Sequence, residues 1–143
     1  MALVYATEAD LSAAPWSITP LPANVGRLLA YASRLVRKAT RSAVYDTDTT
    51  GAPTGTTVVA GFRDAVCAQV AAWSAAGITD PAAEAASTSG GVVTNKSLGP
   101  RAVGYAGAEA AAAERARITR GLTDEAAGYI DDLNLPSAPW VIG

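Results

Sequence analysis

A proline-free stretch from Val25 to about Val44 restricts the fold of this chain more than any other feature of its sequence. Its apolar residues recur every three or four positions, as on one face of an α-helix, and its cations fall on the opposite face. The apolar face holds Leu28, Leu29, Ala32, Leu35, Val36, Ala39 and Ala43, and the basic face holds Arg27, Arg34, Arg37, Lys38 and Arg41. The pattern predicts a long amphipathic helix that begins at an Asn24 cap and buries one face.

A second long helix is predicted from Thr56 or Thr57 to about Ala76. Cys67 lies beside its apolar stripe, which comprises Val59, Phe62, Val66, Val70 and Trp73. The stripe has the spacing needed to pack on the apolar face of the first helix. We therefore expect the two helices to form an antiparallel αα-hairpin that carries the core.

Shorter elements are predicted around this pair. Thr7 and Thr123 are N-cap residues followed by acidic residues, so they predict helices over residues 8–14 and 124–133. Residues 107–120 are an Ala-rich helix former, and residues 78–91 predict a connection with one helical turn around residues 82–86. Residues 92–105 contain two β-biased runs around a Leu-Gly-Pro turn and predict a β-hairpin. Because an isolated hairpin is marginal in water, its candidate contacts with the helices or a neighbouring subunit are Val92, Val93, Leu98, Val103 and Tyr105.

The expected fold class is mainly α: an antiparallel helical bundle around the long αα-hairpin, with one β-hairpin and a C-terminal helix plus an extended tail. Alanine supplies 33 of the 143 residues and aromatic residues only 6%, which predicts a thin core of closely packed helices. The chain has the length of a single domain. Its parts are a helical core at 7–76, a β-hairpin at 92–105, C-terminal helices at 107–133 and a tail at 134–143.

The sequence offers no constellation typical of catalysis. It contains no histidine, which excludes imidazole bases and His-ligated metal sites, and its single cysteine excludes an internal disulfide or a thiolate zinc site. We expect Cys67 to be a buried, unreactive thiol. Asp46 and Asp48 lack the glycine and terminal glutamate of an EF-hand loop, and the glycine-rich segments lack the phosphate-binding fingerprints. No catalytic residue, metal or cofactor is therefore predicted.

The order of these elements resembles the head–tail connector, or adaptor, proteins of long-tailed bacteriophages and gene transfer agents. The resemblance covers nearly the whole chain and depends on order rather than on any one motif. The segments that carry it are Tyr5–Leu11, Leu28–Val36, Phe62–Val70 with Trp73, Lys96–Tyr105, Leu122–Ala126 and Pro139–Val141.

The resemblance implies a structural virion protein without enzyme activity, located in the neck and assembled in the bacterial cytoplasm. Its subunits would form a dodecameric ring beneath the portal protein and above a stopper or tail-terminator protein. Genomic DNA would pass through the lumen without sequence-specific contacts, and no membrane would be involved.

Two groups of candidate contact residues follow. Portal docking is expected from the apolar residues of a segment for which the sequence indicates no core to join, namely Tyr129, Ile130, Leu133, Leu135, Trp140, Val141 and Ile142. The basic face would line the channel or meet acidic neighbours, and its candidates are Arg34, Arg37, Lys38 and Arg41. A plain solvated helix face is the alternative interpretation of these cations.

Two other functions remain open from the sequence. The first is another neck protein, a stopper or tail terminator, although such proteins tend to be rich in β-structure. The second is a small helical nucleic-acid-binding regulator that uses the basic face. The net charge of −2 and the pI of about 5.0 count against it, since nucleic-acid-binding domains are usually basic.

Overall fold

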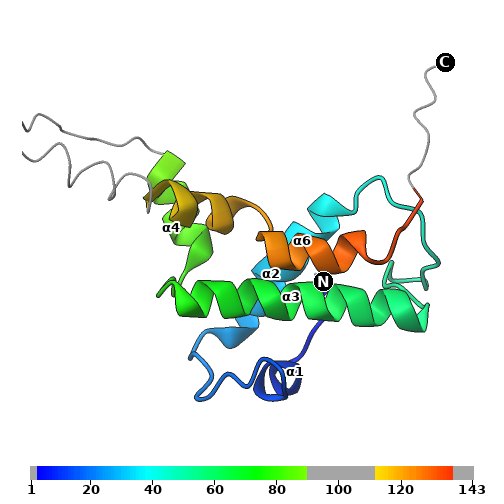
Figure 1. The fold of residues 1–143 in the computed structure, drawn as a ribbon, viewed down its shortest axis with the longest axis horizontal. Coiled ribbons are helices and arrows are strands. Elements are labelled where there is room, and N and C mark those ends of the chain that lie inside the picture. The colour runs from blue at the N-terminus through cyan, green and yellow to red at the C-terminus, as the bar shows by residue number, and fades with distance from the viewer. Residues whose placement is uncertain (1–2, 90–111, 137–143) are drawn as a thin grey trace, which may run out of the picture.

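Helix α3 (Thr56–Ala75) runs through the middle of the molecule, and the other helices pack around it (Figure 1). The computed structural model describes residues 3–89 and 112–136. The other named helices are α1 (Glu8–Ser12), α2 (Val25–Ala39), α4 (Pro81–Ser89) and α6 (Asp124–Asp131). Residues 112–120 form a further helix, called here the 112–120 helix. The fold is mainly helical, as predicted, and the described ranges hold no strand beyond a bridge between Thr47 and Pro53.

Helix α3 is buried on several sides, because α1, α2 and α6 all pack against it. The predicted stripe residues Phe62, Val66, Val70 and Trp73 are completely buried, whereas Val59 is 39% exposed. The burial extends well beyond one stripe to Gly61, Ala65, Cys67, Ala68 and Gln69. A helix enclosed by several neighbours needs no single apolar face, which is why periodicity alone described it incompletely.

Helix α2 buries the predicted apolar face but ends earlier than predicted. Its last residue is Ala39, and the hydroxyl of Thr40 donates to the carbonyl of Val36 at 2.9 Å just beyond it. The Asn24 side chain makes no cap hydrogen bond and instead donates to the carbonyl of Thr79 at 2.7 Å. The helix crosses obliquely behind α3 rather than lying alongside it (Figure 1).

Both predicted threonine caps are present. At α1 the Thr7 hydroxyl accepts from the amide of Asp10 at 3.2 Å, while the Asp10 carboxylate accepts from the Thr7 amide at 2.8 Å. At α6 the Thr123 hydroxyl accepts from the amide of Ala126 at 3.1 Å. Each helix ends two residues before its predicted end, at Ser12 and at Asp131.

The connection after α3 was predicted too loosely. Residues 81–89 form the helix α4 instead of one turn. Its start is set by Pro81, which favours the first helical position, and by the Asp80 carboxylate, which accepts from the amide of Ala83 at 3.2 Å. The predicted β-hairpin at 92–105, with Val92, Val93, Leu98, Val103 and Tyr105, lies outside the described residues.

The premise behind the portal-docking candidates is wrong for the four that the structure describes. Tyr129, Ile130, Leu133 and Leu135 do have a core to join, since they are partly buried against it. Leu133 reaches so close to α3 that a Cβ atom at Gly61 would lie 2.6 Å from its Cδ2. The remaining candidates, Trp140, Val141 and Ile142, lie outside the described residues.

Candidate functional site

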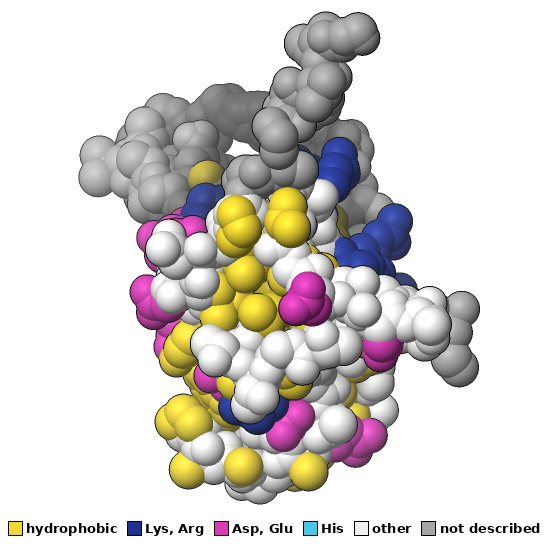
Figure 2. Space-filling model, turned by 90° about the vertical axis from the view of Figure 1, so that its right-hand side faces the viewer, with side chains coloured by type: hydrophobic (Ala, Val, Ile, Leu, Met, Phe, Trp, Pro, Cys, Tyr) yellow, Lys and Arg dark blue, Asp and Glu magenta, His cyan; other side chains and the backbone are white. Residues whose placement is uncertain are grey.

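The solvent side of α2 carries a concentration of positive charge. Residues 25–39 include four cations and no acid, and Arg41 lies two residues beyond the end of the helix. Figure 2 shows the largest group of Lys and Arg side chains along one edge of the molecule, with Asp and Glu spread over the rest of that view. The arrangement follows from the helical spacing, which places the apolar residues inward and leaves the basic residues outward.

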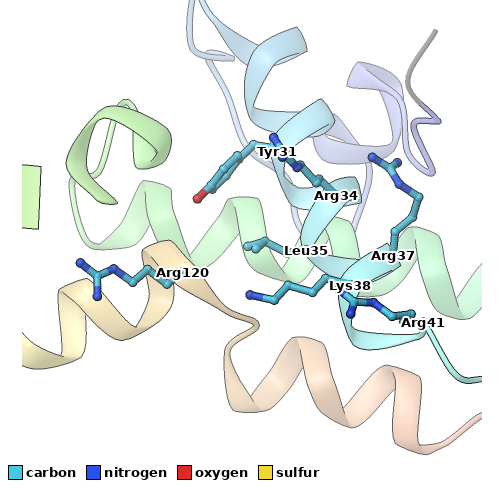
Figure 3. A pocket seen from close by; sticks show the side chains of 7 residues that line it. All are labelled: Tyr31, Arg34, Leu35, Arg37, Lys38, Arg41 and Arg120. Carbon is cyan, nitrogen blue, oxygen red and sulfur yellow. The ribbon is translucent and has the colours of Figure 1, made fainter. Parts of the chain in front are cut away.

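The cations of α2 form one wall of an open groove of about 690 Å³. Tyr31 and Leu35 lie at its base, and Arg120 approaches from the opposite wall, which the 112–120 helix supplies (Figure 3). The basic side chains of this wall are Arg34, Arg37 and Lys38 of α2 and Arg41 just beyond it. A second hollow of about 480 Å³ continues the groove past Arg27 to Ala82 of α4. Among the described residues that line the two hollows, none is acidic.

The cations differ in whether they already interact with other residues of the same chain. Arg37 donates to the carbonyl of Leu3 at 2.8 Å, and Arg27 pairs with Asp80 at 3.5 Å. By contrast, Arg34, Lys38 and Arg41 have no ion-pair or hydrogen-bond partner within residues 3–89 and 112–136. Those three, together called the free basic triad, lie at spacings of four and three residues on the exposed face. They are available to an external anion.

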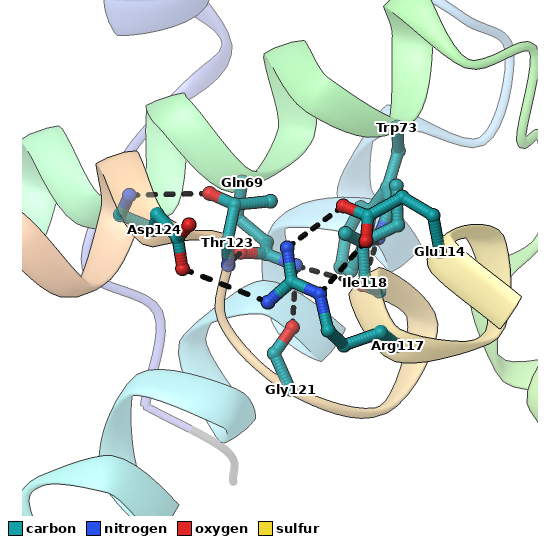
Figure 4. A network of polar contacts seen from close by, with 9 residues as sticks. Gln69, Trp73, Glu114, Arg117, Ile118, Gly121, Thr123 and Asp124 are labelled. Carbon is teal, nitrogen blue, oxygen red and sulfur yellow. Dashed lines mark hydrogen bonds and ion pairs between the residues drawn. The ribbon is translucent and has the colours of Figure 1, made fainter. Parts of the chain in front are cut away.

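A buried polar network holds the wall that carries Arg120 (Figure 4). The Gln69 amide of α3 donates to the carbonyls of Ile118 and Gly121 at 2.9 and 3.0 Å, and its oxygen accepts from the amide of Thr123 at 2.9 Å. The Trp73 indole donates to the same Ile118 carbonyl at 2.7 Å. The Gln69 side chain thus makes three hydrogen bonds. Through them it fixes the turn between the 112–120 helix and α6.

Three further contacts complete this wall. The Tyr31 hydroxyl donates across the groove base to the carbonyl of Thr119 at 2.8 Å. Arg115 pairs with Glu84 of α4 at 2.9 Å and donates to the carbonyl of Ala76. The groove therefore has two fixed walls, each anchored to α3.

The sequence pattern indicates the α2 wall of the groove but not the opposite wall. Arg120 was not singled out, because nothing in its neighbourhood along the chain links it to residues eighty positions earlier. Gln69 was also missed. Its signal was a long amide side chain in the middle of an otherwise apolar helix, a position that requires hydrogen-bond partners when it is buried.

The other candidate chemistry gives no site. Cys67 is completely buried, and this burial raises the pKa of its thiol to about 12, so the thiolate that a nucleophile needs is not populated near neutral pH. No three acidic or cysteine side chains in the described ranges gather closely enough to hold a metal ion. None of the helices described is both long and apolar enough to cross a membrane.

No family model, curated protein or solved structure matches this chain.

Proposed function

We propose that this chain is the subunit of a head–tail connector, a structural ring that joins the DNA-filled head of a long-tailed phage or gene transfer agent to its tail. The observation that carries the proposal is the groove with cations on both walls and a free basic triad on one of them. Such a surface suits the binding of a macromolecular anion, such as DNA in the channel or an acidic surface of a neighbouring protein. The mainly helical architecture is compatible with the resemblance that suggested this family.

In this proposal the ring is dodecameric and lies between the portal and a stopper or tail-terminator protein. Genomic DNA passes through its lumen without sequence-specific recognition. The groove would serve either that DNA or an acidic surface of a neighbouring protein. The apolar residues Trp140, Val141 and Ile142 are the proposed contacts with the portal.

The test is electron microscopy of intact particles that carry a tagged copy of the chain. We expect labelled density in a ring directly beneath the portal. Particles that contain the chain elsewhere, or that lack it, would refute the proposal. Untagged particles are the control for labelling, and the packaged DNA content shows whether the tag disturbs assembly.

The free basic triad also favours a second candidate, a nucleic-acid-binding regulator. A regulator would bind short duplex DNA as a free subunit, with an affinity that falls as salt rises because counterions are released from the phosphates. Binding that survives charge reversal of the triad would contradict this second function. A chain that binds no duplex at low salt would exclude it.

A further inference from the structure

We propose that the groove binds the acidic face of helix α6 from a second copy of this chain, so that subunits associate head to tail. This inference deepens the proposed function by naming the contact between ring subunits. It begins from the free basic triad, Arg34, Lys38 and Arg41, which is exposed and has no partner in the described part of its own chain. Charged groups of this kind select partners with the complementary charge pattern.

Helix α6 presents such a pattern. Its inner side carries Ala126, which is completely buried, and the partly buried Ile130. Its outer side carries four exposed carboxylates on one helical face, Asp124, Glu125, Asp131 and Asp132. Gly128 lies between them, and a Cβ atom there would meet nothing within 4 Å. The middle of the acidic face is therefore free of side chains, and a neighbouring helix can approach it closely.

The two charge patterns have the same spacing along the sequence. Arg34 and Arg41 are seven residues apart, and so are Asp124 and Asp131. On α6 the seven residues correspond to about 10.5 Å at the helical rise. On the basic side Arg34 and Lys38 lie on α2, and Arg41 lies two residues beyond its last residue, Ala39. Arg34 and Lys38 therefore offer two cations on one helix face to the carboxylates of α6, and Arg41 adds a third in the same groove.

The described residues of one copy do not make this contact with each other. No ion pair joins α2 to α6 among the described residues, and the one ion pair that an α6 carboxylate makes there is between Asp124 and Arg117, at 3.7 Å. Each subunit would thus use its basic groove for one neighbour and its acidic face for another. A contact between two different surfaces is heterologous, and such contacts build rings when the rotation closes.

The distribution of charge around the groove favours a protein helix over a long phosphate chain. Beyond the end of α2 the surface continues into a hollow lined by Ser42 and Asp131. A nucleic-acid strand that followed α2 past Arg41 would approach the Asp131 carboxylate, whereas a helix with a charge pattern of limited length need not extend that far. The net charge of −2 adds a general repulsion toward long polyanions.

A charge-swap experiment tests the proposal on the full chain. One variant reverses the triad (Arg34→Glu, Lys38→Glu, Arg41→Glu), and a second reverses α6 (Asp124→Lys, Glu125→Lys, Asp131→Lys, Asp132→Lys). Association is measured by sedimentation over a concentration series at low and high salt, with circular dichroism to verify folding. Arg37 is left unchanged because it also binds the Leu3 carbonyl.

The wild-type chain should associate at low salt and dissociate as salt screens the charges. Each single-face variant should associate at least about tenfold more weakly, since several attractions between exposed charges become repulsions. A mixture of the two variants should associate again, and so should one chain that carries both reversals. The matched control, Glu8→Lys with Asp46→Lys, changes exposed acids away from α6 and should associate like the wild type.

Three results would overturn the contact: a wild-type chain that stays monomeric at low salt, single-face variants that associate normally, or a doubly reversed chain that does not recover. Duplex DNA binding that is lost in the triad variant, with self-association intact, would assign the groove to nucleic acid instead. Failure of the proposed function can be told apart from failure of this contact, because the function is tested by the location of the chain in particles. A chain that associates as expected but is absent from the neck would refute only that function.

Discussion

The side chain of Gln69 should contribute more to stability than any other polar side chain of the core, and Gln69→Leu tests this. The replacement is similar in size but removes both the donors and the acceptor. The Ile118 carbonyl keeps its hydrogen bond from Trp73, whereas the Gly121 carbonyl and the Thr123 amide lose the partner that Gln69 provides. A buried polar group left without a partner costs about 1–3 kcal/mol, so the two together predict a loss of about 2–6 kcal/mol.

That loss is a large part of the stability of a typical domain, about 5–15 kcal/mol. Urea unfolding, followed by circular dichroism and tryptophan fluorescence, measures it as a shift of the midpoint. The matched control is Thr119→Val, because Thr119 is equally buried but its hydroxyl donates only within its own helix, to Ala116. If Gln69→Leu costs no more than this control, the reasoning about the network is refuted.

A variant that keeps part of the network gives a second, pH-dependent readout. Gln69→Glu retains an oxygen that can accept from the Thr123 amide, but its ionised carboxylate would face the Ile118 and Gly121 carbonyls. Burial and those carbonyls disfavour the charged form, so the pKa of the carboxyl should be raised in the folded state. The penalty should therefore grow as pH rises through neutrality and shrink in mildly acidic solution. A pH-independent difference from the wild type would contradict this account.

Three further predictions concern single side chains. Gly128→Ala should raise the free energy of unfolding by about 0.5–1 kcal/mol, because the new methyl group enters open space on a helix, and urea unfolding would detect a wrong sign. Gly61→Ala should lower it by about 1 kcal/mol or more, because its Cβ would collide with the Leu133 side chain, and Leu133→Ala in the same chain should relieve the collision. Cys67 should resist a thiol reagent at pH 8 in the native protein and react promptly in urea, and rapid native labelling would show that its burial is overestimated.

The sequence predicted those elements whose burial is one-sided. Helix α2 has one apolar and one basic face, so its periodicity identified both its core residues and its exposed cations. Helix α3 is covered on several sides, and there the buried set includes Ala65, Ala68 and Gln69, which no single stripe contains. Val59 is exposed for the opposite reason, since the first turns of α3 project beyond the helices that cover the rest.

Other differences arose because tertiary contacts decide what local composition leaves open. Residues 81–89 are rich in alanine and serine, a composition that suits a loop as well as a helix, and the ion pair between Glu84 and Arg115 ties the helical form to a distant segment. The apolar residues of α6 seemed to lack a core because no pattern along the chain indicated that α3 would receive them. The α2 wall of the groove was predictable because its cations share one face of a single helix. The Arg120 wall was not predictable, because tertiary contacts bring it there from a distant segment.

In the proposed contact between subunits, the fixed geometry of the groove lets individually weak ion pairs define an assembly. Each exposed ion pair contributes only about 0–1 kcal/mol, so one contact between the free basic triad and an acidic α6 would be weak and easily reversed. The packing of α2 and α6 on α3 holds both charge patterns in place before association, so little ordering is required when they meet. In a closed ring each subunit is held by two neighbours, and the dissociation of one subunit requires both contacts to break together. Contacts that are weak between two free subunits can therefore give a stable ring.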